Sequence, residues 1–468
     1  MTQGLRILLF LSSGLVIGAL IAFMAPDIGY VKMAVLPLVI LAVGLLIRDP
    51  FWPLLLLVLA VPLDAVANRA FEGLPLTAST GLLILTLAAL AMRMPHEPRE
   101  TRLGPFDPTV AWALAFVIAM MISMMLAGDR EAAEEAAKRM GGMLLITLLI
   151  IRIVRTPQQL RLLVLGLVGA TLFSGAVLII ETKLGIRLLS SHEAALISAY
   201  GDQERSAGAS DQNPTTAALM LSTGVIIAMA LALEYRKVRL LTVSALAVGL
   251  LAVVYSYARS AALVVIAVAP FILWRHRGNR YFPFGLLVLF GMGIASLPLI
   301  PESYWARLSS LGNFDTDYTL WRRLGYNIIG LDLLAQNPLF GVGPGNFPQL
   351  YVADEYRYMP GRTLTPRMLH NLYLGMAVEV GLVGLAAFLA MIVGGLARLI
   401  AAISRSTDPV GRAFGLALVF GSAAFLFGAL VTPAQFMKYT WVLIALVAVQ
   451  ARLMQPGPST TARPPAET

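Results

Sequence analysis

The chain has no cysteine and few charged residues. Of its 468 residues, 58% are hydrophobic and 13% are charged. The absence of cysteine excludes structural disulfides, thiolate metal sites and a cysteine nucleophile, so any part outside the cytoplasm must be held by packing and hydrogen bonds. The mean hydropathy of +0.79 lies far outside the range of soluble globular domains. The sequence therefore predicts an all-α polytopic membrane protein.

The net charge is +9, and the basic residues lie between apolar runs. Their placement is the kind of signal that sets the orientation of membrane helices. This distribution excludes nucleic-acid binding. The basic clusters fall on alternate connections, so we expect one cytoplasmic face that also holds both termini. The clusters are Arg48; Arg93, Arg99 and Arg102; Arg152, Arg155 and Arg161; Arg236, Lys237 and Arg239; Arg275, Arg277 and Arg280; and Arg398, Arg405 and Arg412.

Apolar runs long enough for a hydrocarbon core of ~30 Å predict about 12 to 14 transmembrane helices. The first run follows Arg6 and is followed at once by a second, so it is read as a spanning helix and not as a signal peptide. The expected helices are 5–25, 31–47, 51–67, 79–92, 109–127, 141–153, 160–180, 214–233, 239–257, 261–274, 282–300, 371–398, 411–431 and 439–453.

Two extracytoplasmic segments are much longer than the roughly 2 to 8 residues that usually join membrane helices. They divide the chain into expected parts. Residues 1–300 hold transmembrane helices and the shorter loop, 181–213; residues 301–370 form a large loop; residues 371–453 hold the C-terminal helices; and residues 454–468 form a disordered cytoplasmic tail.

An amphipathic helix is expected inside the large loop. Apolar residues recur at helical spacing from Leu320 to Leu331, and Asn337–Pro338 is a stop signal. Arg322 and Arg323 lie near its start. The helix either lies on the bilayer with its arginines at the headgroups or contributes them to a site, and the two roles are compatible.

The next stretch, residues 337–347, reads NPLFGVGPGNF and superficially resembles a nucleotide-binding loop. No strand precedes it and no Walker lysine follows, so that match is weak. The glycines and Pro344 favour a tight turn against the membrane domain. Backbone N–H groups that remained exposed there would help to hold a phosphate.

Arg259 interrupts a long apolar run. As one helix, Leu240 to Trp274 would measure roughly 52 Å, which overshoots a single span. A hairpin at Ser256 to Ser260 resolves the excess and places Arg259 on the extracytoplasmic side. A charge at membrane depth is costly, so Arg259 faces a polar cavity or an anion, or else its side chain extends to the lipid headgroups.

His370 stands at the start of the apolar helix expected at 371–398. Its ordinary pKa near 6.5 suits a general base at neutral pH, and the alternative is a helix-start histidine that meets the headgroups. Asn371 is expected to cap the helix. Glu379 lies inside the apolar helix, where a carboxylate needs an arginine partner or a polar cavity, with either a structural or an orienting role.

These residues resemble the signature of the bacterial O-antigen ligase and O-antigen polymerase superfamily. His370–Asn371, followed by Gly381 and Gly384, looks like the family motif, and NPLFGVGPGNF looks like its loop lead-in. Arg259 with Leu263 is similar to an arginine element earlier in the family pattern. One departure is Asp317, where members often carry an arginine, so that role falls to Arg322 or Arg323.

The resemblance implies a membrane glycosyltransferase of the C-type fold that uses no metal or cofactor. Its donor would be an undecaprenyl-diphosphate-linked glycan and its acceptor lipid A-core, at the periplasmic face of the bacterial inner membrane. His370 would be the catalytic base, Arg259, Arg322 and Arg323 would bind the diphosphate, and Asn371 and Glu379 would support them. Arginine suits this role because its planar fork binds phosphate oxygens in bidentate fashion.

Alternative functions stay open at this point. A polymerase of O-antigen or exopolysaccharide uses the same donor with another acceptor, and a protein O-oligosaccharyltransferase would glycosylate a side chain. A flippase or transporter fits the helix number alone. Transporters usually contain internal repeats and broken helices in matched halves, and the sequence shows no such repeat.

Overall fold

The computed structural model describes residues 44, 46–70, 77–96, 107–189, 205–210, 212–278, 282–283, 287, 318–359 and 361–455. These residues form helices, with no strand among them. The helices are α3 (Phe51–Leu59), α4 (Asp64–Ala70), α5 (Ala78–Arg93), η1 (Met94–His96), α7 (Pro108–Leu126), α8 (Arg130–Ile153), α9 (Pro157–Leu184), α11 (Pro214–Glu234), η2 (Arg236–Val238), α12 (Arg239–Tyr255), α13 (Arg259–Arg275), α16 (Tyr318–Gln336), α17 (Phe347–Tyr351), η5 (Asp354–Tyr356), α18 (Leu372–Arg405), α19 (Pro409–Gly428), η6 (Ala429–Val431), η7 (Ala434–Phe436) and α20 (Lys438–Leu453).

Six helices in the described part of the chain are long and apolar enough to cross a membrane: α7, α9, α11, α12 with η2, α18, and α19 with η6. The chain is therefore a polytopic, all-α membrane protein, as the composition predicts. The expected helices 5–25, 31–47 and 282–300 and the tail 454–468 lie largely outside the described residues. The total of about 12 to 14 helices stays a prediction.

Four helices begin with the same local signal, a capping side chain followed by proline. The capping oxygen accepts a backbone N–H of the first turn, and proline at the first helical position has no N–H that needs a partner. The pairs are Asp107–Pro108, Thr156–Pro157, Asn213–Pro214 and Asp408–Pro409. These signals explain why the observed starts of α7, α9, α11 and α19 lie within a few residues of the expected ones.

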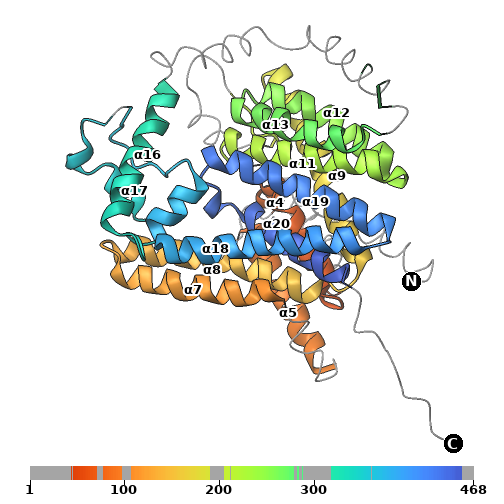
Figure 1. The fold of residues 1–468 in the computed structure, drawn as a ribbon, viewed down its shortest axis with the longest axis horizontal. Coiled ribbons are helices and arrows are strands. Elements are labelled where there is room, and N and C mark those ends of the chain that lie inside the picture. The colour runs from red at the N-terminus through yellow and green to blue at the C-terminus, as the bar shows by residue number, and fades with distance from the viewer. Residues whose placement is uncertain are drawn as a thin grey trace, which may run out of the picture.

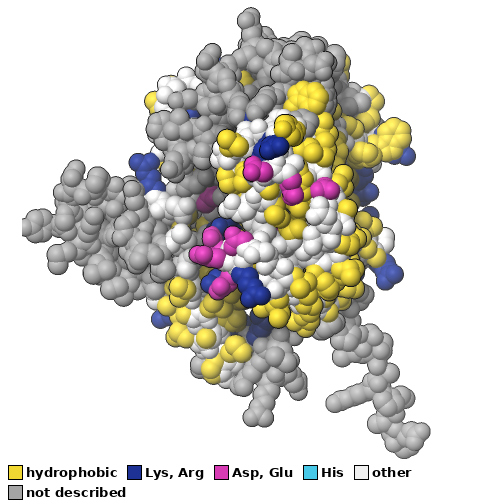
Figure 2. Space-filling model, turned by 90° about the vertical axis from the view of Figure 1, so that its left-hand side faces the viewer, with side chains coloured by type: hydrophobic (Ala, Val, Ile, Leu, Met, Phe, Trp, Pro, Cys, Tyr) yellow, Lys and Arg dark blue, Asp and Glu magenta, His cyan; other side chains and the backbone are white. Residues whose placement is uncertain are grey.

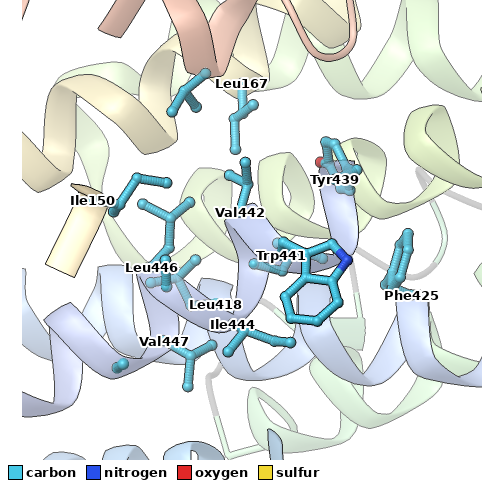
Figure 3. Close-up of a cluster of buried hydrophobic side chains, with 14 of the residues drawn as sticks. Ile150, Leu167, Leu418, Phe425, Tyr439, Trp441, Val442, Ile444, Leu446 and Val447 are labelled. Carbon is cyan, nitrogen blue, oxygen red and sulfur yellow. The ribbon is translucent and has the colours of Figure 1, made fainter. Parts of the chain in front are cut away.

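Long helices lie side by side in Figure 1, with α7, α8 and α18 along one edge and α9, α11, α12 and α13 along the other. Between them, α20 is buried along nearly its whole length. Figure 3 shows Trp441, Val442 and Leu446 of α20 pointing among side chains of neighbouring helices. Trp441 packs its ring 5.7 Å from those of Phe116 and Phe388, which ties α20 to α7 and α18.

The basic connections gather at one end of the bundle. Arg161 lies 3.7 Å from Asp408, which joins the α8–α9 connection to the α18–α19 connection. Arg275 forms a 3.1 Å ion pair with Glu234, at the ends of α13 and α11. The described basic clusters therefore share one end, as the alternation predicts, and α16 and α17 lie at the opposite end (Figure 1).

Three expected boundaries are wrong. The run 51–67 forms two helices, because Pro62 lacks the N–H needed to continue α3. α8 begins at Arg130 and not near 141, because its charged first turns carry i,i+4 ion pairs such as Glu134–Lys138 and stay helical beyond the apolar part. α9 continues to Leu184, where Gly185 ends it with a positive φ of 64°.

The expected continuous helix 371–398 is also wrong. α18 runs from Leu372 to Arg405, but Gly381 inside it has φ 72° and ψ 178°, which no helical residue adopts. In the expected loop 181–213, residues 205–210 are buried in the bundle, and Ala209 N donates to Ser174 Oγ of α9 at 3.1 Å.

Replacing Gly381 with alanine should lower the thermal stability of the purified protein, by roughly 2–4 kcal/mol. The backbone at this position has φ 72°, which a residue with a Cβ disfavours, and the new Cβ would overlap the carbonyl of Leu339. Gly394→Ala in the same helix is the matched control, because a Cβ there meets nothing within 4 Å. Thermal unfolding in detergent measures both, and equal midpoints for the two variants would contradict the role of Gly381.

Candidate functional site

The first turn of α18 holds His370 at a fixed place. Asn371 is the N-cap of the helix, and its Oδ1 accepts the backbone N–H groups of Tyr373 at 3.0 Å and Leu374 at 3.2 Å. The hydroxyl of Tyr373 donates to the carbonyl of Leu426 at 2.9 Å. The helix start is therefore tied to the end of α19, and His370 directly precedes it.

The break in α18 is filled by the backbone of the loop 337–346, which we name the glycine loop. Leu382 N donates to Pro338 O at 2.9 Å and Val383 N donates to Leu339 O at 3.2 Å. In the other direction, Val342 N donates to Val378 O at 2.8 Å. The loop thus takes the place of hydrogen bonds that a continuous helix would make within itself.

The glycines of this loop are needed for its close approach. Gly341 has φ 71°, and a Cβ there would overlap Val378 O and lie 2.7 Å from Gly381 N. The loop N–H groups are also engaged, since Gly343 N donates to Glu379 O at 3.1 Å. These contacts support the tight turn that the sequence favours, and they leave those N–H groups unable to cradle a phosphate.

Glu379 faces the glycine loop. Its side chain is buried and accepts the backbone N–H of Gly345, and its own carbonyl accepts Ser123 Oγ at 2.7 Å. Its Oε2 has no hydrogen-bond partner among the described residues, and no arginine of that part of the chain forms an ion pair with it. Glu379 therefore lies where the loop, α7 and α18 meet.

His370 stacks on Tyr326 of α16. The two ring centroids are 5.4 Å apart and the ring planes differ by 11°. On its other side Tyr326 meets Tyr351 of α17 edge-on, at 5.2 Å. Burial raises the pKa of Tyr326 to about 12, with the neighbouring Tyr351 acting in the same sense and the arginines Arg322 and Arg367 acting against it.

Three arginines act on His370. Burial is the main cause that lowers the pKa of His370 to about 3, and the charges of Arg323, Arg367 and Arg322 add to it in that order. The side-chain Nδ1 of His370 is buried and has no hydrogen-bond partner within the described residues. The imidazole is therefore neutral at pH 7, in a strongly positive environment.

The arginines come from two segments. Arg322 and Arg323 lie on α16, and Arg322 is 8% exposed. Arg367 precedes His370 by three residues, and its buried Nε has no hydrogen-bond partner among the residues that the structure describes. A fourth arginine, Arg362, is structural, because it donates to the carbonyls of Tyr351, Val352 and Ala353.

Arg259 begins α13 directly after the expected hairpin, which the structure confirms. The turn is held by Arg205, whose Nε donates to Ser256 O at 2.9 Å, and Tyr257 has a positive φ of 53°. Arg259 lies at the His370 end, because α13 packs against the end of α19 near Gly428. The charges that act on His370 in the described structure do not include that of Arg259.

Arg367 and Tyr326 are the site residues that sequence reasoning missed. Arg367 is separated from His370 by only two residues, and this proximity was the available signal. Tyr326 follows Arg322 by four residues, which puts both on one helix face. In the sequence Tyr326 looks like an ordinary packing residue of an amphipathic helix. Its contact with His370 depends on how α16 packs against the start of α18.

Figure 2 turns this end of the molecule towards the viewer and shows acidic and basic side chains gathered on it, with apolar side chains beside them. Charged first turns of α8, such as Glu131 and Glu135, are exposed here. The described residues contain no group of three or more His, Asp or Glu arranged to hold a metal ion. The candidate site at this end is thus built from one histidine and several arginines.

Fold and site together define a polytopic membrane protein with a histidine and arginine site at one end of its bundle. Residues 244–389 match the family model described as O-antigen ligase. This match spans Arg259, Arg322, Arg323, His370 and Glu379, and it confirms the resemblance to the O-antigen ligase and polymerase superfamily. The search of curated proteins found no match.

His370 should stay neutral down to about pH 4, because its pKa is lowered to about 3. The unfolded chain binds this proton near pH 6.5, so stability should fall as pH drops from about 6.5 towards 3. Nuclear magnetic resonance of labelled histidine rings measures the titration, with His370→Gln for assignment. A transition of this ring near pH 6.5 would contradict the geometry.

Proposed function

We propose that this protein transfers an undecaprenyl-diphosphate-linked glycan to an acceptor hydroxyl at the periplasmic face of the bacterial inner membrane. The observation that carries the proposal is the neutral His370 among Arg322, Arg323 and Arg367. The family match to O-antigen ligase supports activity on such glycans. In this proposal both termini and the basic connections are cytoplasmic, and the His370 end is periplasmic.

The reaction needs a base and a stabilised leaving group. The acceptor oxygen attacks the anomeric carbon, the bond from that carbon to the diphosphate oxygen breaks, and His370 takes the acceptor proton. The arginines bind the diphosphate oxygens and stabilise the negative charge that develops on them. In this assignment Arg322, Arg323 and Arg367 bind the diphosphate near His370, and Arg259 binds the donor from α13.

The low pKa of His370 fits this order of events. A base with a pKa near 3 is weak at neutral pH, but Arg322 and Arg323, two of the three arginines that lower this pKa, lie on α16 and would bind the donor. A diphosphate between the arginines offsets their charge, and the pKa of His370 then rises. His370 therefore becomes a stronger base when the donor is bound.

Lipid A-core is the acceptor that we propose first, which makes the protein an O-antigen ligase. A Wzy-type polymerase and a protein O-oligosaccharyltransferase share the donor and the base, and differ in what occupies the acceptor side. A flippase is the alternative from another class. The cluster of His370 with arginines favours a transferase over a flippase, because translocation needs no base.

Replacing His370 with alanine should lower the transfer rate by about 10²–10⁴-fold while insertion and folding persist. Transfer of a purified lipid-linked glycan in proteoliposomes measures the rate. His276→Gln is the matched control, because His276 lies near Glu234 at the other end of the bundle. Normal transfer by His370→Ala would remove His370 as the base.

A gel of surface polysaccharide from a deletion strain distinguishes the acceptors. Full-length glycan that is missing from lipid A-core and accumulates on the carrier lipid indicates a ligase. Products limited to one repeat unit indicate a polymerase. Loss of glycan from a protein alone indicates the oligosaccharyltransferase, and a change of sidedness without a new glycosidic bond indicates a flippase.

Replacing Arg259, Arg322 or Arg323 with alanine should raise the donor KM by about tenfold or more, because each charged hydrogen bond to a phosphate is worth roughly 1.5–3 kcal/mol. Arg357→Ala is the matched control, since Arg357 is an exposed arginine of the same loop that stacks on Tyr358. Initial rates at varied donor concentration give KM. A variant with the KM of Arg357→Ala would exclude that arginine from donor binding.

A further inference from the structure

A polar cavity lies at the His370 end of the bundle. It has a volume of about 50 Å³ and joins four parts of the chain that are far apart in sequence. We name it the Lys438 cavity. Its lining residues are Val61, Asp64, Gln212, Met220, Phe436, Met437, Lys438 and Tyr439.

The polar groups of the Lys438 cavity are held in place by contacts across these segments. Gln212 Nε2 donates to Asp64 Oδ2 at 2.8 Å, and Lys438 Nζ donates to Ser79 Oγ of α5 at 2.8 Å. Asp64 is 9% exposed and its charge acts on Lys438. The ammonium of Lys438, the carboxylate of Asp64 and the amide of Gln212 thus line one cavity.

Such a group is costly in a membrane protein. Moving charged side chains out of water costs several kcal/mol for each ion, and apolar residues of similar volume usually serve stability as well or better. Ionisable residues in membrane bundles therefore mark functional sites by default. No step of the proposed transfer reaction involves Asp64, Gln212 or Lys438.

The cavity lies next to the start of the helix that carries His370. Gln435 precedes the cavity residue Phe436 and approaches α18, since its Nε2 would be 2.7 Å from a Cβ on Gly375. Arg139 of α8 lies over the ring of Phe436, 5.8 Å from its centroid. The segment 429–437 thus contacts α18 through Gln435 and lines the Lys438 cavity through Phe436 and Met437.

The chemistry of the cavity selects a neutral, hydroxylated ligand. Asp64 balances the charge of Lys438, so the electrostatic attraction of a phosphate is weaker in this cavity than among the arginines near His370. Sugar hydroxyls donate and accept hydrogen bonds, and the cavity offers partners of both kinds. The partly buried ring of Phe436 adds the apolar surface that ligand sites usually contain.

We propose that the Lys438 cavity receives a hydroxyl or hydroxymethyl group of one sugar of the acceptor glycan, and that the ring of this sugar stays at the mouth of the cavity. This inference rests on the proposed transferase function, and it gives the acceptor a binding site separate from the diphosphate site. Gln212, which is exposed, lies at the mouth of the cavity. Asp64 and Lys438 then select the acceptor without touching the reacting atoms.

Kinetics of two near-isosteric variants test the proposal. Lys438→Met and Asp64→Asn should raise the KM for purified lipid A-core by about tenfold or more, with donor KM and kcat within about threefold. Lys183→Met is the matched control, because Lys183 lies over Tyr255 at the end of α9, outside the cavity. An unchanged acceptor KM in an active protein would overturn the cavity as acceptor site and leave the transferase function standing.

A binding measurement covers the case in which these variants fold poorly. The chain has no cysteine, so a Gln212→Cys variant carries one thiol at the mouth of the cavity. Core oligosaccharide released from lipid A should slow its alkylation by at least about threefold, in the His370→Ala background, and inorganic diphosphate should not. Equal protection by diphosphate, or none by the oligosaccharide, would overturn the proposal. Wild-type protein that makes no glycosidic bond would instead refute the transferase function.

Discussion

The exchange of backbone hydrogen bonds between α18 and the glycine loop is the constraint on which the site depends. Backbone N–H and C=O groups at membrane depth need partners within the protein. Because α18 opens at Gly381, residues 338–343 supply those partners from outside the helix. The loop follows α16 directly, so this exchange also fixes α16 beside the first turns of α18. Arg322 and His370 are neighbours for that reason.

Burial and positive charge act together at His370. Both lower its pKa, so a neutral imidazole lies near Arg322, Arg323 and Arg367, and this arrangement is the basis for the anionic donor that we propose. The same arginines then serve two purposes in the proposed reaction. They hold the leaving group, and their charge adds to the effect of burial on the pKa of His370. The Lys438 cavity differs in charge balance, and in the proposed reaction this difference would separate the site for diphosphate from the site for sugar.

Local signals in the sequence predicted much of the fold. Apolar runs placed the starts of α7, α9, α11 and α19 to within a few residues, and in the structure a capping side chain followed by proline begins each of these helices. The long apolar run required the hairpin before Arg259. Asn371 was expected as a helix cap and is one. The amphipathic α16 was also expected. Each of these depends on residues close in the chain, whose hydrogen bonds and spacing do not require distant partners.

The sequence by itself determined the membrane class, the grouping of basic connections at one end, and the candidates His370, Arg259, Arg322 and Arg323. Only the tertiary structure decided the break at Gly381, the contact of His370 with Tyr326, and the gathering of Arg367 with the α16 arginines. It alone brought Asp64 near Lys438, 374 positions later in the printed chain. Contacts between distant segments depend on how whole helices pack. The hydropathy along the chain does not determine which helices become neighbours.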